Sequence, residues 1–217
     1  MVAAAHVHGA PRPQEDATVI GLIFGPPGSG KGTQASRIEK EFDMAHLSTG
    51  EILRSEAAHG SHIGNEAARI MAAGDLVPDD LIDRIVGRRL RRTDPGTSVL
   101  LDGFPRTIEQ AKALDAMLAE LGKNVDFVVA LDVPEPALVD RLLHRAAVEG
   151  RADDTRDAIM ERMHEYRGRT AAVLDHYRRI GLPVAEVDGV GDVDKVFERV
   201  REAIERVTGR KSRTGGI

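Results

Sequence analysis

A lysine inside a glycine-rich run is the clearest chemical signal in this sequence. The run reads GPPGSGKGTQ at residues 25–34, after the apolar stretch TVIGLIF and before the helical spacing of ASRIEKEF. Glycines let backbone N–H groups converge on an anion, and a helix that starts beside them aims its positive end at the same point. Lys31 can then reach the terminal phosphates of a nucleotide. The run therefore predicts a phosphate-binding loop between a strand and a helix.

The residue after this lysine departs from the common phosphate-loop pattern, G-x-x-x-x-G-K-[ST], whose last residue ligates Mg²⁺ through its hydroxyl. Gly32 follows Lys31 here, and the hydroxyl comes one place later, at Thr33. Either a magnesium ligand has been lost, or the metal is held by phosphate oxygens and water, as Mg²⁺ often is. The spacing alone leaves both interpretations open.

A second group of polar residues follows the apolar run TSVLLD. Asp102 ends this run, and the turn GFP then leads to Arg106. A carboxylate in this place suits the orientation of magnesium-bound water, and the guanidinium suits an anion clamp. Gln110, one helical turn further, offers both a donor and an acceptor to the edge of a base.

Two arginines four residues apart, Arg141 and Arg145, share one face of a predicted helix. Like charges at this spacing mildly oppose the helix, so an anion between them is one interpretation and a solvated surface is the other. The pair leads into EGRADD, which contains Arg151, and Arg162 follows eleven residues later.

Short apolar runs alternate with segments of helical spacing along the chain. Five runs predict strands: TVIGLIF (18–24), AHLS (45–48), TSVLLD (97–102), DFVVALD (126–132) and PVAEVD (183–188). Helices are predicted at 79–93, 107–121 and 154–179, with a small helical excursion at 49–77. Alternating strands and helices form a mostly parallel sheet, and such sheets bind ligands beyond the carboxyl ends of their strands.

The composition bounds the class of protein. A chain of 217 residues is long enough for one α/β core with small inserted lobes. With 41% hydrophobic and 30% charged residues it resembles a soluble globular protein, and no apolar run approaches the ~20 residues that a membrane span needs. The formal charge of -5 argues against nucleic-acid binding through overall basicity. Zero cysteines exclude disulfides, thiolate catalysis and Cys-type zinc sites.

The two ends of the chain differ from the rest. Residues 1–17 are rich in Ala, Pro and His, and residues 208–217 are short, basic and Gly-containing. We predict that both are flexible tails and that the ordered part spans about 18–207. The first residues lack the apolar core of a secretory signal, so a cytoplasmic location is expected.

Several motifs, taken in order, resemble those of adenylate kinases and their nucleoside-monophosphate kinase relatives. They are the phosphate loop with Gly directly after its lysine, HLSTGEILR (46–54), GDLVPDD (74–80), LLDGFPRTIEQ (100–110) and the arginine string of 141–162. The resemblance covers about 18–207 and implies a P-loop NTPase-like three-layer α/β/α fold with a five-stranded parallel sheet. It also implies a small helical lobe that binds the monophosphate, at about 48–77, and a short lid at about 144–154.

The resemblance also implies roles for individual residues. Binding of ATP would fall to Gly28, Ser29, Gly30, Lys31, Gly32, Thr33, Arg141, Arg145 and Gly191. Binding of AMP would fall to Thr49, Arg54, Asp75, Leu76, Val77, Gly103, Phe104, Pro105, Arg106, Gln110, Arg151 and Arg162. Catalytic roles are implied for Lys31, Asp102, Arg106, Arg141, Arg145, Arg151 and Arg162, with Asp153 and Asp154 orienting the arginines of the lid. On this resemblance, Gly32 is a family feature and Mg²⁺ would have no direct protein ligand. The ion would be held by phosphates and water, with Asp102 behind them. No structural zinc is expected.

The implied activity is the reversible reaction ATP + AMP ⇌ 2 ADP, which balances adenine nucleotides. A monomer is expected, with ATP, AMP and ADP as ligands and without a nucleic-acid or membrane partner. One alternative is a pyrimidine monophosphate kinase of the UMP/CMP type, but such relatives usually carry Ala in place of Thr49 and Asn in place of Gln110. The other alternative is a nucleotide-binding regulator without turnover, for which Glu149, a carboxylate beside the predicted phosphate site, is the only motive.

Overall fold

The protein is built around a five-stranded parallel sheet. The computed structural model describes residues 18–149 and 154–213. The strands are β1 (Ile20–Phe24), β2 (Met44–Ser48), β3 (Ser98–Asp102), β4 (Phe127–Asp132) and β5 (Val184–Asp188). Their order in the sheet is β2-β3-β1-β4-β5. All five predicted strands are confirmed, and their bounds differ from the predicted ones by at most two residues.

Helices fill the connections between these strands. They are α1 (Lys31–Phe42), α2 (Thr49–Ala58), α3 (His62–Ala73), α4 (Asp79–Arg92), α5 (Ile108–Glu120), α6 (Glu135–Glu149), α7 (Arg156–Glu165), the π-helix η2 (Tyr166–Thr170), α8 (Ala171–Arg179) and α9 (Val193–Thr208). Within the described ranges, none of them is long and apolar enough to cross a membrane.

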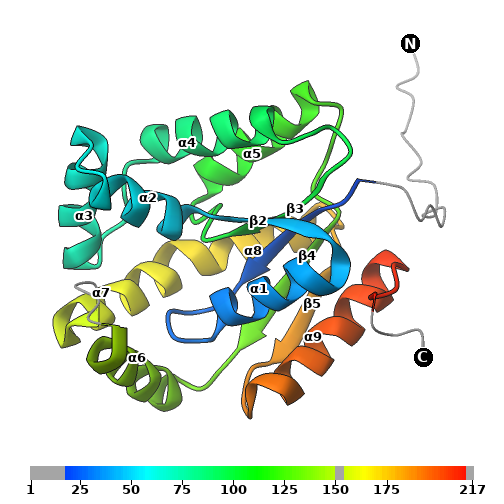
Figure 1. Ribbon diagram of the computed structural model, residues 1–217. Coiled ribbons are helices and arrows are strands. Elements are labelled where there is room, and N and C mark those ends of the chain that lie inside the picture. Colours follow the sequence, from blue (N-terminus) through cyan, green and yellow to red (C-terminus); the bar gives the residue numbers. More distant parts are fainter. Residues whose placement is uncertain (1–17, 150–153, 214–217) are drawn as a thin grey trace.

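Two helical layers cover the two faces of the sheet (Figure 1). Successive side chains of a strand point to opposite faces. Leu22 and Leu101 accordingly pack in a core with α4, α5 and α8, whereas Ile23 and Leu100 pack in a second core with α1 and α9. The near-continuous apolar runs of the sequence follow from this arrangement, because a parallel strand covered on both sides buries every residue. The three-layer α/β/α fold is therefore confirmed.

The carboxyl ends of the parallel strands meet at one edge of the sheet. There β1 ends at Phe24, β2 at Ser48 and β3 at Asp102, with Ser48 and Asp102 paired directly in the ladder. The phosphate loop, the STGE segment and the GFPR turn all begin at this edge. It is also where the order of strands reverses, which is the usual ligand crevice of an open α/β sheet.

The predicted helix over 154–179 is interrupted in the structure. Thr155 caps α7 by accepting from the N–H of Ala158, and the five residues of η2 separate α7 from α8. A π segment is a local insertion in a helix and is common at functional sites. The hydroxyl of Thr170, its last residue, donates to the carbonyl of Arg106 at 3.2 Å.

The predicted carboxyl-terminal tail is partly packed against the domain. Thr208 is the last residue of α9. The N–H of Arg213 donates to the carbonyl of Glu41 at 2.9 Å, its guanidinium pairs with Asp43, and Ser212 is buried. Arg213 thus lies against the end of α1, and Arg210 and Ser212 bond to Ser98 and Glu205. Residues 1–17 and 214–217 lie outside the described part.

The excursion between β2 and β3 holds two helices in close contact, α2 and α3. Gly64, in the first turn of α3, makes this contact possible: a methyl group there would stand 2.2 Å from the carbonyl carbon of Glu56 and 2.3 Å from the nitrogen of Ala57. Such distances require a shift of backbone.

We expect Gly64→Ala to lower the free energy of unfolding by about 1–3 kcal/mol, because the added methyl pushes α3 away from α2. Gly168→Ala is the matched control, since a methyl at that helical position meets nothing within 4 Å. It should be neutral or stabilising by up to ~1 kcal/mol. Urea unfolding measures both, and a Gly64→Ala protein as stable as the wild type would contradict the packing described.

Candidate functional site

The glycine-rich loop between β1 and α1 leads directly into the N-terminus of α1. Gly28 and Gly30 adopt left-handed φ values of 81° and 91°, which only glycine takes without strain. Gly30 is the N-cap of α1 and has no side chain with which to accept from the first N–H groups of the helix. These donors and the positive end of the helix dipole are therefore available to an anion.

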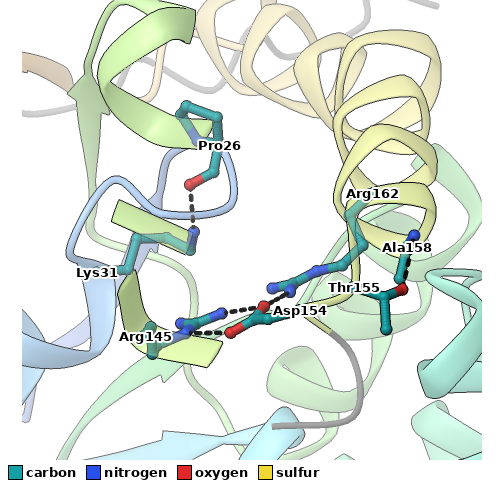
Figure 2. Close-up of polar contacts among 7 residues, drawn as sticks. All are labelled: Pro26, Lys31, Arg145, Asp154, Thr155, Ala158 and Arg162. Carbon is teal, nitrogen blue, oxygen red and sulfur yellow. Dashed lines mark hydrogen bonds and ion pairs between the residues drawn. The ribbon is translucent and has the colours of Figure 1, made fainter. Parts of the chain in front are cut away.

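Lys31 reaches back over this loop. Its Nζ donates to the carbonyl of Gly25 at 2.6 Å and to that of Pro26 at 3.0 Å (Figure 2). Burial lowers the pKa of Lys31 to about 8; Asp102 opposes this shift, and Arg106 adds to it. A positive charge is thus held at the loop at neutral pH, in surroundings where a phosphate would stabilise it.

Asp102, at the end of β3, is held by a residue of the neighbouring strand. Nε2 of His46 in β2 lies 3.3 Å from Oδ2 of Asp102. Burial alone would raise the pKa of Asp102, but the hydrogen bond with His46 and the charge of Lys31 keep it below its usual value. The same pair raises the pKa of His46 against the effect of its own burial. Asp102 is therefore ionised at neutral pH.

A buried carboxylate joins two of the predicted arginines. Arg145 of α6 donates to Asp154 through Nε at 2.6 Å and through NH2 at 2.7 Å, and Arg162 of α7 donates to it at 2.6 Å. The side chain of Asp154 is 0% exposed. Figure 2 shows the two guanidiniums converging on it from different helices. Asp154 thus binds Arg145 and Arg162, and its role of orienting the lid arginines toward phosphates stays a prediction. Arg151 and Asp153 lie outside the described residues.

Arg106 is held at its backbone and at its side chain. Its Nε donates to the carbonyl of Gly103 at 2.8 Å, and its N–H donates to Oε1 of Gln110 at 2.7 Å. Together with the bond from Thr170, these contacts fix the turn after the cis Phe104–Pro105 peptide.

These elements enclose a cleft of about 600 Å³. Among the described residues, five cationic side chains line it: Lys31, Arg54, Arg106, Arg145 and Arg162. Gly28, Gly30, Gly32 and Thr33 of the loop line it as well, as do the carboxylates of Glu51, Asp75, Asp102 and Glu149. So many cations around one space favour a ligand with several negative charges.

A smaller cavity of about 40 Å³ opens off this cleft. The two spaces share five lining residues: Gly50, Met71, Asp75, Gly103 and Arg106. The cavity is otherwise lined by Thr49, Leu53, Leu76, Val77, Ile82 and Gln110. Its apolar walls, with the polar side chains of Thr49 and Gln110 and the charged ones of Asp75 and Arg106, suit contact with a base. Most of the residues predicted to bind a monophosphate surround this one space.

Some predicted residues lie elsewhere. Ser29 is buried beneath the loop. Phe104 is also buried, and together with Pro105 it lines another small cavity, which shares Lys31, Arg106 and Arg162 with the cleft. Arg141 donates to the carbonyl of Gly189 at 3.2 Å, in the same loop after β5 as Gly191. Arg141 and Gly191 are therefore not among the residues that line the cleft.

Two polar partners at the site were not predicted. His46 stands behind Asp102, and Asp79, the first residue of α4, accepts from Gln110 at 2.7 Å. The signal for His46 is a single polar side chain between Ala45 and Leu47 in a predicted strand. Asp79 offers no comparable signal, since acidic residues are common at helix starts.

The oxygen donors of the cleft fit a magnesium ion that arrives with phosphates. Among residues 18–149 and 154–213, no group of three or more His, Asp or Glu side chains could hold a metal on its own. Asp102 is an ionised carboxylate that lines the same cleft as the phosphate loop. Mg²⁺ accepts one or two carboxylates together with phosphates and water.

Comparison with known proteins gives consistent similarities. The sequence model of a family described as adenylate kinase matches residues 23–182. A protein from Stenotrophomonas maltophilia (strain R551-3) named adenylate kinase is 45% identical over 184 residues, which cover 85% of this chain and 98% of the relative. One of the same name from Xanthomonas euvesicatoria pv. vesicatoria (strain 85-10) is 45% identical over 185 residues, with the same coverage of both chains.

We expect binding of a magnesium nucleoside triphosphate to take up a proton at pH 8.5. The lowered pKa of Lys31 leaves part of the lysine neutral in the free protein above pH 8, and the bound phosphates restore its charge. The phosphates themselves are fully ionised at this pH and contribute little uptake. Calorimetric titrations in two buffers of different ionisation enthalpy measure the protons exchanged.

Lys31→Met should abolish this uptake and weaken binding by at least about tenfold. Lys40→Met is the matched control, because Lys40 is exposed in the last turn of the same helix. Its affinity and proton uptake should equal those of the wild type. A wild-type titration at pH 8.5 with no proton uptake would contradict the lowered pKa of Lys31.

Proposed function

The chain belongs to the adenylate kinase family of nucleoside-monophosphate kinases, and from this premise we propose that it catalyses reversible transfer of the γ-phosphoryl group from MgATP to AMP, giving two ADP. The observation that carries the proposal is the pair of adjoining spaces. A cleft with a phosphate loop and five described cations adjoins a mainly apolar cavity that also contains Thr49 and Gln110. The arrangement suits two nucleotides whose phosphates meet between the cations.

The cations supply what phosphoryl transfer requires. The transition state spreads negative charge over three equatorial oxygens, so alignment and charge stabilisation dominate the catalysis. Lys31 would hold the donor's terminal phosphates, Arg54 and Arg106 the acceptor phosphate, and Arg162 the group in transit. A general base is not needed, because a monophosphate has a second pKa near ~6 and is mostly a dianion at pH 7.

Some residues proposed to bind the donor ATP do not line the cleft. Arg141 and the loop of Gly191 would hold the adenosine of ATP, and Arg145 its phosphates. Arg151 would complete the lid, as the family resemblance implies. Adenylate kinases use Mg²⁺ with ATP, and here Asp102 would orient the water bound to the ion, whose charge would offset that of the phosphates.

Both substrates must be enclosed before transfer, since water in the site would hydrolyse the donor. We propose that the α2–α3 excursion, about 48–77, and the segment at about 144–154 are the closing elements. Residues 144–149 are the last turns of α6. A cytoplasmic location, a monomeric state and a role in adenine nucleotide homeostasis stay predictions from the sequence.

Two alternatives are weaker. A pyrimidine monophosphate kinase is disfavoured by Thr49 and Gln110, which both line the cavity proposed for the acceptor base. A regulator without turnover was suggested by Glu149, which lines the cleft near the predicted phosphate site. The neighbouring arginines supply compensating positive charge, so the carboxylate alone gives no reason to exclude catalysis.

We expect kcat/KM for AMP to exceed that for CMP, UMP and GMP by at least about tenfold at saturating MgATP, because Thr49 and Gln110, which line the acceptor cavity, favour adenine as the family resemblance implies. A coupled assay of ADP formation measures each monophosphate. Lys31→Met, purified in the same way, should lose the activity and so exclude a contaminating kinase. Binding without turnover, or a pyrimidine as the best acceptor, would overturn the proposed reaction.

A further inference from the structure

Asp79 forms a hydrogen bond with Gln110, the side chain proposed to recognise the acceptor base. Its Oδ1 accepts from Nε2 of Gln110 at 2.7 Å, and its Oδ2 accepts from the hydroxyl of Thr107 at 2.8 Å. Thr107 in turn caps α5 by accepting from the N–H of Gln110 at 3.1 Å. Gln110 is only 2% exposed. Asp79 itself is not among the residues that line the cavity, so it acts through Gln110.

The second partner of this amide is the backbone of the anion clamp. Oε1 of Gln110 accepts from the N–H of Arg106 at 2.7 Å. An ionised carboxylate can only accept a hydrogen bond, and a backbone N–H can only donate one. If the amide of Gln110 were flipped by about 180°, its NH₂ group would face the N–H of Arg106 and its oxygen would face the carboxylate of Asp79. The chemistry of the two partners therefore permits one orientation of the amide.

This orientation determines what Gln110 can offer to a ligand. One hydrogen of Nε2 and one lone pair of Oε1 remain after the bonds to Asp79 and Arg106 are made. Thr49, in the same cavity, donates its hydroxyl hydrogen to the carbonyl of Gly103 at 3.0 Å, so toward a ligand it has lone pairs. Toward a ligand, Gln110 and Thr49 thus offer two acceptors and one donor between them, beside the charged side chains of Asp75 and Arg106.

The four common bases differ in how they match this set. Adenine and cytosine carry an exocyclic amino group, which donates, beside an unprotonated ring nitrogen, which accepts. Guanine and uracil carry a carbonyl oxygen beside a ring N–H, which is the reverse arrangement. With its amide fixed, Gln110 can accept from the amino group of adenine or cytosine and donate to the ring nitrogen. With guanine or uracil, its oxygen would face the carbonyl oxygen and its N–H would face the ring N–H.

We propose that Asp79 is a specificity-determining residue of the acceptor site: by fixing the amide of Gln110, it selects amino-bearing bases over keto-bearing ones. The inference rests on the proposed phosphoryl transfer to a nucleoside monophosphate and adds the reason for its base preference. The size of the base then distinguishes adenine from cytosine. The amide of Gln110 distinguishes adenine from guanine and cytosine from uracil. The wild type should prefer AMP to GMP and, among the poorer pyrimidine substrates, CMP to UMP.

The test compares ratios of kcat/KM, in which the fraction of correctly folded enzyme cancels. Asp79→Ala leaves Gln110 held at one end only, and the AMP-to-GMP and CMP-to-UMP ratios should each fall about tenfold, as expected when one charge-assisted hydrogen bond is lost. Asp79→Asn keeps an amide oxygen that can still accept from Gln110, so its ratios should stay within about threefold of the wild type.

Asp80→Ala is the matched control, because it removes the adjacent carboxylate, which is exposed and pairs only with Arg84 at the surface among the contacts described for it. Its ratios should equal those of the wild type. If Asp79→Ala lowers kcat/KM for all four monophosphates equally, Asp79 has a structural role and the proposal is wrong. A wild type that prefers a keto base to the amino base of the same size also overturns it.

The proposed reaction can fail separately from this inference. A wild type that prefers CMP to AMP would contradict the proposed acceptor, yet a tenfold fall of the CMP-to-UMP ratio in Asp79→Ala would still support the fixed amide. A wild type that prefers AMP but shows the same ratios in Asp79→Ala and Asp80→Ala would leave the reaction standing and overturn the inference alone.

Discussion

Mutual repulsion among the cations of one cleft is the constraint on which the site depends. Burial is the main reason why the pKa of Lys31 falls to about 8, and the nearby charges of Arg106 and Arg162 lower it further against the opposing effect of Asp102. Asp102 and Asp154, both nearly inaccessible to water, are placed where they offset part of this charge. A bound polyphosphate would neutralise the remaining positive charge, so the binding of the ligand itself would relieve the repulsion.

The sheet explains why these groups can be held together at all. Asp102 ends a strand, the phosphate loop follows the adjacent one, and His46 lies in the strand on the other side. Asp154 stands just before the cap of α7, where it meets the arginines of two helices. Each of these charged groups is thus held on a helix or strand or directly beside one, which keeps the loss of conformational freedom on ligand binding small.

Much of this arrangement could be predicted from local sequence, and the exceptions have physical reasons. The strands, the phosphate loop and the turn at Asp102 each depend on contiguous residues, and all were predicted close to their observed bounds. The hydrogen bonds from His46 to Asp102 and from Gln110 to Asp79 join residues 56 and 31 positions apart. No periodicity encodes such pairs, because the sheet order and the packing of α4 on α5 create them. The packing of residues 209–213 was missed for the same reason, since a basic, glycine-containing end gives no sign of its partners on α1.

The most direct test of the account is a crystal structure with a two-substrate analogue, in which two adenosines are joined by five phosphates, and Mg²⁺. The account predicts that the phosphates run between Lys31 and Arg106, with one adenine against Thr49 and Gln110. It predicts that the ion is held by phosphates and water with Asp102 behind them. An analogue bound outside this cleft would contradict the central claim that both phosphate chains meet among these cations. Thr33 as a direct ligand of Mg²⁺ would contradict the interpretation of Gly32.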